Sequence, residues 1–181
     1  MIKHATKKSF SLVVFVVLFF SYNAFSSEIT QDEIVQKYYM SDLNGIRLGK
    51  YNDDNFEKLY SWQYEPGWDY AFIVDEVNIY NTKKLSNSST SVEVKYHIIG
   101  ILGGDNVNTY EFYEIVNFIL VNDGSSWKIK EPIIPPHISI TAAIKQLEEI
   151  IRVDGEADKY RAIKLKYTVV RLNRPLKIIS I

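Results

Sequence analysis

The order of apolar and polar residues predicts helices at both ends of the mature chain and strands between them. Thr30 and Glu33 have the spacing of a capping box, in which the Thr30 side chain accepts a hydrogen bond from the Glu33 N–H. Apolar residues then recur on one face until the Asn44-Gly45 stop signal, which predicts a first helix. A second, short helix is expected over residues 55–60.

From Tyr70 onward the pattern changes to that of strands, which we expect over 70–80, 91–102 and 110–121 and from Trp127. Residues 83–90 form a polar connection. In 91–102, one face carries apolar residues and the other carries polar ones; they are Val92, Val94, Tyr96 and Ile98 against Glu93, Lys95 and His97. One face is therefore expected to be buried and the other to be exposed to solvent. We expect the sheet to be antiparallel.

Three prolines, at 132, 135 and 136, mark the exit from this sheet, because proline cannot donate to a strand ladder. A helix is expected next. Its apolar stripe consists of Ala143, Ile144, Leu147, Ile150 and Ile151. Residues 164–172 read as one more strand. The predicted fold class is α+β, with N-terminal helices on an antiparallel sheet and an extra C-terminal helix and strand.

The last predicted hairpin carries a family resemblance. Residues 118–121, the turn Asn122-Asp123-Gly124 and the closing Trp127-Lys128-Ile129 resemble the penultimate strand, turn and final strand of the nuclear-transport-factor-two-like superfamily. The resemblance covers about residues 30–131. It implies a curved, cone-like sheet with helices packed in its concave side. The cavity between them is then expected to serve catalysis, to bind a small ligand or simply to be filled by the core. Some relatives resemble immunity proteins that neutralise a toxin.

The first 26 residues have the features of a secretory signal peptide: early lysines, an apolar run over 12–20 and a small-residue exit at Ala24-Phe25-Ser26. The run is short for a bilayer span, so we expect cleavage near Ser27 and no stable membrane anchor afterwards. Residues 27–181 then form one domain. Because the chain has no cysteine, it forms no disulfide, which suits an exported protein of the bacterial periplasm.

Charge is unevenly distributed along the chain. All 22 acidic residues lie between residues 27 and 158, whereas 159–181 contains seven basic residues and no acidic one. The acidic body suits basic partners. The basic segment is either a docking surface for an anionic partner or a strand that folds back on the sheet, and we favour the second because its apolar residues need cover. An export signal argues against nucleic acid as a partner.

A catalytic reading rests on His97, for which neighbouring strands could supply Asp75 or Glu114, because a carboxylate that orients an imidazole is sound general-base chemistry. By alternation, however, His97 lies on the wet face. We therefore expect no catalytic residue and no cofactor. His137 follows two prolines and has no partner at metal-ligand spacing, so no metal site is predicted.

A second candidate site is aromatic. Five rings fall within residues 60–70, around a turn at Glu65-Pro66-Gly67. They either plug the mouth of the sheet or bind a partner, and the residues predicted to bind are Trp62, Tyr64, Trp68 and Tyr70. The best interpretation is an exported, non-catalytic protein that recognises another protein, as a periplasmic immunity or inhibitor protein does. The alternatives are a protein that binds a small ligand or a cell-wall saccharide and, less favoured, an enzyme with its active site in the cavity. Both a monomer and a homodimer are compatible with the sequence.

Overall fold

The computed structural model describes residues 29–48, 54–104, 106–154 and 168. The predicted signal peptide lies outside these residues. Of the basic segment 159–181 only Thr168 is described; it is helical, so the strand expected over 164–172 does not hold at that residue.

The described residues form nine helices and strands. In order they are α1 (Gln31–Leu43), the 3-10 helix η1 (Ile46–Leu48), α2 (Asp54–Glu57), β1 (Tyr70–Lys84), β2 (Ser89–Gly103), β3 (Asn106–Asn122), β4 (Trp127–Glu131), β5 (His137–Ser139) and α3 (Ile140–Asp154). The five strands form one sheet in the order β4-β3-β2-β1-β5. Neighbours are antiparallel except β5, which runs parallel to β1.

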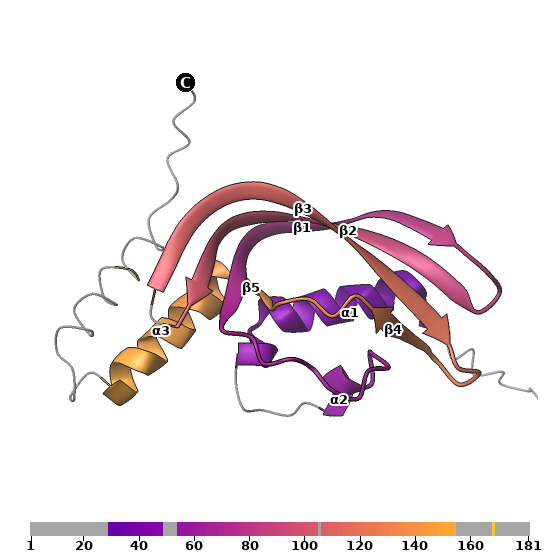
Figure 1. Ribbon diagram of the computed structural model, residues 1–181, viewed down its shortest axis with the longest axis horizontal. Coiled ribbons are helices and arrows are strands. Elements are labelled where there is room, and N and C mark those ends of the chain that lie inside the picture. Colours follow the sequence, from indigo (N-terminus) through magenta and orange to yellow (C-terminus); the bar gives the residue numbers. More distant parts are fainter. Residues whose placement is uncertain (1–28, 49–53, 105, 155–167, 169–181) are drawn as a thin grey trace, which may run out of the picture.

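The sheet arches over α1, and α3 packs near one end of the arch (Figure 1). This confirms the predicted α+β class, with an N-terminal helix on a curled sheet and a C-terminal helix. The parallel edge strand β5 was not predicted: it precedes α3, unlike the strand expected over 164–172, and it makes the sheet mixed where an antiparallel one was expected. Helices over a strongly curled mixed half-barrel are compatible with the cone fold of the nuclear-transport-factor-two-like superfamily.

Helix α1 begins where the sequence predicts. The Thr30 Oγ1 accepts from the Glu33 N–H at 3.3 Å, and the Glu33 carboxylate accepts from the Thr30 N–H at 2.8 Å. The reciprocal bonds satisfy two of the backbone donors that a helix start leaves unpaired. The apolar face of α1, which includes Ile34, Val35 and Tyr38, is buried.

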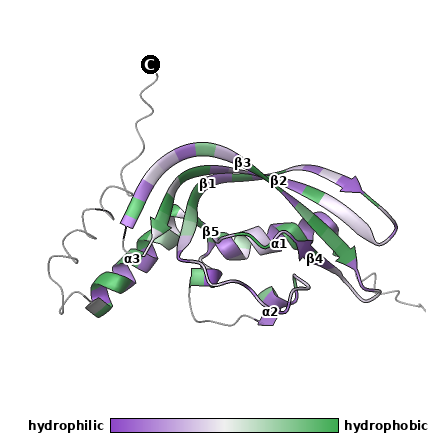
Figure 2. Cartoon of the chain, viewed as in Figure 1, coloured by the Kyte–Doolittle hydropathy of each residue, from purple (hydrophilic) through white to green (hydrophobic). Residues whose placement is uncertain are grey.

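Strand β2 confirms the predicted alternation. Its even-numbered apolar residues 92–98 are at most 1% exposed and pack with α1, whereas Glu93, Lys95 and His97 point to the other side. We call the side toward α1 the concave face and the opposite side the convex face. Figure 2 shows the hydrophobic and hydrophilic residues alternating along the arched strands.

Two apolar clusters support the arch. The larger one lies between α1 and the concave face, and the smaller one joins α3 to the ends of β1 and β2 through Ile73, Leu102 and Leu147. Ala143 and Leu147 are fully buried, which confirms the predicted stripe of α3.

Two predicted boundaries are wrong. Helix α2 ends at Glu57 rather than residue 60, because Tyr60 lies in a parallel bridge with Ile129, flanked by a 2.8 Å hydrogen bond from the Ile129 N–H to the Leu59 carbonyl. The connection expected over 83–90 is shorter than predicted, because β1 continues to Lys84 and β2 starts at Ser89, pairing Lys84 with Thr90.

Candidate functional site

The aromatic segment 60–70 is divided between the core and a surface pocket. The Trp62 ring stacks on Tyr60 with centroids 4.3 Å apart and meets Tyr38 edge-on, so Trp62 packs with the core. Tyr64 is 76% exposed and lies outside the pocket lining. Trp68 and Tyr70 both line the pocket. The structure therefore brings together two of the four aromatic residues predicted to bind.

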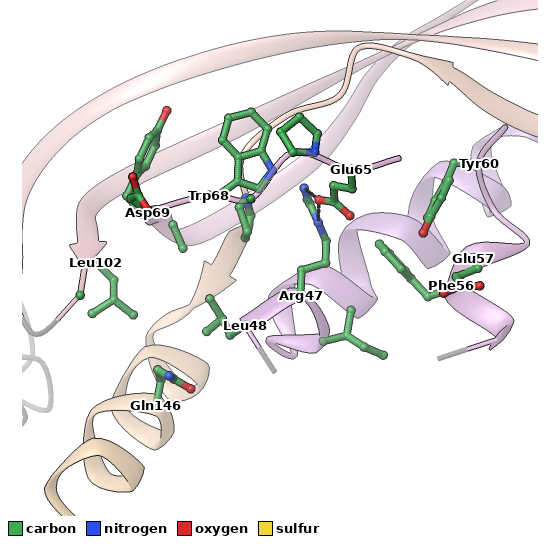
Figure 3. Close-up of a pocket in the computed structure, with 17 residues that line it drawn as sticks. Arg47, Leu48, Phe56, Glu57, Tyr60, Glu65, Trp68, Asp69, Leu102 and Gln146 are labelled. Carbon is green, nitrogen blue, oxygen red and sulfur yellow. Dashed lines mark hydrogen bonds and ion pairs between the residues drawn. The ribbon is translucent and has the colours of Figure 1, made fainter. Parts of the chain in front are cut away.

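This mouth pocket has a volume of about 450 Å³ and lies between η1, α2, the segment 65–69, the start of β1 and α3. Figure 3 shows Trp68 and Asp69 on one side, Leu48 and Gln146 below them, and Phe56 and Tyr60 across the pocket. Aromatic rings and carboxylates dominate the lining: Phe56, Tyr60, Trp68 and Tyr70, with Glu57, Glu65 and Asp69. Such a mixture of apolar walls and a few polar groups is typical of binding sites.

Arg47, the one basic residue among the described residues that line the pocket, has no donor left for a ligand. Its Nε and Nη2 donate to the Glu65 carboxylate, and its Nη1 donates to the Tyr38 hydroxyl and the Asp42 carboxylate, both at 3.0 Å. Nη2 also donates to the Ile134 carbonyl. These contacts use all five N–H groups of the guanidinium, and the side chain is only 4% exposed.

The described lining of the pocket is therefore electronegative. Asp42 and Glu65 flank the Arg47 charge, and Glu57 and Asp69 add carboxylates without a basic residue in the described lining to balance them. The buried Nε1 atom of Trp68 has no hydrogen-bond partner among the described residues. Carboxylates beside aromatic faces attract a cationic group, which gains both ion pairing and cation–π contact.

Asp42, at the end of α1, is the buried anchor of this network. Burial raises its pKa to about 6, against the opposing effects of the Arg47 charge and a 2.8 Å hydrogen bond from the His137 N–H. Its Oδ1 atom has no partner among the described residues. Asp42 thus connects the mouth pocket to the interior of the arch.

His137, which was not predicted to belong to a site, lies at the centre of the interior of the arch. It is 1% exposed, and its ring lies 4.3 Å from the Tyr96 ring and 5.1 Å from the Phe72 ring. Nδ1 lies 2.9 Å from the Pro135 carbonyl oxygen, and Nε2 lies 3.1 Å from the Glu114 carboxylate.

His97 and Asp75 meet on the convex face, with Nδ1 and Oδ1 2.7 Å apart. The His97 ring stacks on Tyr113 at 4.5 Å, and neither His97 nor Asp75 lines the mouth pocket. Glu114 is not part of this group. Tyr113 pairs with His97 across the two strands and shares its convex face. Glu114 follows Tyr113 and therefore points to the concave face, where its carboxylate meets His137.

Arg47 and His137 were both missed from the sequence. One signal was present: each stands among apolar residues, Arg47 between Ile46 and Leu48 and His137 before Ile138, which indicates burial. Their distant partners had no local signal, since Arg47 reaches Ile134, 87 residues away, and His137 reaches Glu114, 23 residues away.

The chain has no match among protein-family models, curated proteins or solved structures. Within the described residues, no three His, Asp or Glu side chains are grouped so as to hold a metal ion. None of the described helices has the length and apolar character that crossing a membrane requires.

Proposed function

We propose that the chain is an exported, non-catalytic binding protein that recognises another protein, and that the mouth pocket receives a cationic side chain of that partner. The observation that carries the proposal is the pocket itself: Trp68 and Tyr70 stand beside carboxylates, and the Arg47 donors are all engaged. Tryptophan and tyrosine anchors in a pocket are typical of the residues that dominate protein interfaces.

Two further features support binding over catalysis. The buried His137 contacts Glu114 and Pro135 through its two ring nitrogens, so neither nitrogen is directed at a free substrate position. The His97–Asp75 pair lies on an open strand face rather than in the mouth pocket. The acidic composition of residues 27–158 favours a basic partner and fast, salt-sensitive association.

The proposal has a finer form, in which the chain is an exported member of the nuclear-transport-factor-two-like superfamily that acts as an immunity or inhibitor protein in the periplasm. Its support is the curled sheet, together with the signal-like residues 1–26. N-terminal sequencing of the protein from a periplasmic fraction tests the export. We expect a start within a few residues of Ser27, and an uncleaved chain in the inner membrane would contradict it.

A small-ligand or saccharide binder is the second candidate. It is favoured by the buried Trp68 Nε1, which has no partner among the described residues and could donate to a ligand hydroxyl. Titration with cell-wall saccharide fragments distinguishes the two candidates, because a saccharide binder would show saturable quenching of tryptophan fluorescence without any protein partner.

The main test compares two ring truncations from the same segment. A photo-reactive side chain introduced at residue 64, beside the pocket, captures the partner, which is then purified and its affinity measured. We expect Trp68→Ala to weaken binding by about 30-fold, or about 2 kcal/mol, whereas Tyr64→Ala leaves it within about threefold. Thermal unfolding must show that both variants are folded. Equal affinities for wild type and Trp68→Ala would exclude the mouth pocket from the interface.

A further inference from the structure

Strand β3 has an outer edge that the described chain leaves largely uncovered. On one side β3 pairs with β2 along nearly its whole length, but on the other side β4 pairs only with Ile119–Asn122 (Figure 1). After Glu131 the chain leaves the edge at Pro132, which has no N–H to donate. Over residues 108–118, no described strand lies on the outer side of β3.

This edge lacks the usual protection against strand addition. In a β-strand the backbone N–H and C=O groups point alternately to the two sides, so about half of those in 108–118 face outward. Natural edges are commonly protected by lysine or proline, and 108–118 contains neither. Instead it exposes Tyr110, Tyr113 and Ile115, each more than half exposed. Strand-forming residues beside backbone groups that no described strand pairs favour the addition of an extended segment.

A groove of about 470 Å³ accompanies this edge. One side is β3 at Glu114 and Ile115, and the other is the departing chain at Glu131, Pro132 and Ile134. The groove places two carboxylates beside apolar side chains. Glu114 is fixed there by its 3.1 Å contact with the buried His137.

The charge of the edge identifies the kind of segment that fits. Residues 108–118 contain Glu111 and Glu114 and no basic residue, and Glu131 lies across the groove. On the neighbouring strand β2, Lys95 Nζ lies 4.0 Å from the centre of the Tyr113 ring, and His97 Nε2 lies 3.7 Å from the Glu111 carboxylate. A second copy of this chain would bring the same carboxylates to the edge, whereas a basic strand would neutralise them.

We propose that the outer edge of β3 binds an extended Lys- or Arg-rich segment of a partner protein and adds it to the sheet as a further strand. The backbone groups of 108–118 supply sequence-independent hydrogen bonds. Side chains of the added strand alternate between Phe112 and Glu114 on the concave face and Glu111 and Tyr113 on the convex face. This order favours basic residues beside Glu111 and Glu114 and apolar residues beside the two rings between them. This binding mode does not depend on the mouth pocket.

The test uses a synthetic peptide of about eleven residues that repeats the sequence lysine-valine-valine, and a charge-reversed peptide with glutamate for lysine. We expect the lysine peptide to bind with a micromolar dissociation constant and to protect β3 amides within 108–118 from hydrogen exchange. The glutamate peptide should not bind. The decisive control uses two isomers of the lysine peptide. In each isomer, N-methylation removes the backbone N–H donors along one edge of the extended peptide, and the two isomers differ in which edge is blocked. Because only one edge of the peptide can pair with β3, one isomer should bind at least about tenfold more weakly than the other.

Matched variants of the protein locate the site. Glu111→Gln at the edge should weaken the lysine peptide several-fold, while Glu148→Gln on the exposed face of α3 and Trp68→Ala in the mouth pocket should leave it unchanged. Equal affinity of both N-methylated isomers, or no binding of the lysine peptide at about 1 mM, would overturn the proposal. It would also be overturned if 108–118 were already protected in the free protein, by its own chain in a monomer or by a second copy in a dimer.

Discussion

Two histidine–carboxylate pairs lie on opposite faces of the same sheet. His97 and Asp75 meet at 2.7 Å on the convex face, and His137 and Glu114 meet at 3.1 Å on the concave face. The His97 side chain is 15% exposed, whereas that of His137 is 1% exposed. The two carboxylates are equally exposed, at 37%, so the pairs differ in the burial of the histidine.

Burial, rather than the contact distance, gives the two pairs different roles. An ion pair at the surface contributes little, because water and salt screen it and two side chains must be held in place. His137 instead joins three elements, since its N–H donates to Asp42 at the end of α1 and its ring contacts β3 through Glu114. Substitutions around the two pairs should therefore differ strongly in their effect on stability.

Removal of Arg47 should have the largest effect. Arg47→Ala leaves the Asp42 carboxylate, which is 1% exposed, without a neutralising cation, so we expect the free energy of unfolding to fall by about 3–5 kcal/mol. Urea denaturation measures this change. Arg152→Ala is the control, because the Arg152 side chain is 71% exposed in its pair with Glu149 and its loss should change stability by less than about 1 kcal/mol. Similar losses for the two variants would contradict the assigned role of Arg47.

His137→Ala should have the next largest effect. The substitution removes a ring packed between Tyr96 and Phe72 and leaves Glu114 without its partner, so we expect a loss of about 2–4 kcal/mol in the free energy of unfolding. Thermal and urea unfolding of the variant and the wild type give the value. A loss below about 1 kcal/mol would mean that His137 is not a structural link between β5 and β3.

The local and nonlocal parts of the molecule differ in what the sequence could predict. The capping box of α1 and the alternation of β2 depend on residues close in the chain, and both were predicted correctly, including the convex position of His97. The His137–Glu114 contact joins residues 23 apart and depends on how the chain returns to β1 after Pro136. No local pattern encodes that return, so Glu114 was assigned to the wrong histidine, whereas Asp75, the other candidate, does meet His97. The inward position of Trp62 also had no local signal, because it depends on packing against Tyr38 of α1.

The pH dependence of stability should report on Asp42. Burial raises its pKa from the ordinary 3.8 to about 6, so between about pH 4 and pH 6 the folded state binds more protons than the unfolded state. The stability of the wild type relative to Asp42→Asn should therefore fall as the pH rises through this range, by about 2–3 kcal/mol, and stay level above about pH 7. Urea denaturation of both proteins across this range measures the difference, and a difference independent of pH would show that Asp42 titrates alike in both states.

The smallest effect is expected at the exposed pair. His97→Ala removes the contacts with Asp75 and Tyr113 on a face open to water, so the free energy of unfolding should change by less than about 1 kcal/mol. Affinity for a captured partner should also stay near that of the wild type, because His97 does not line the mouth pocket. Asp75→Asn is the matched variant, since it removes the charge of the pair and leaves the imidazole. If His97→Ala abolished a measurable turnover while the protein stayed folded, the convex pair would be catalytic. The ranking by burial would then predict stability but not function.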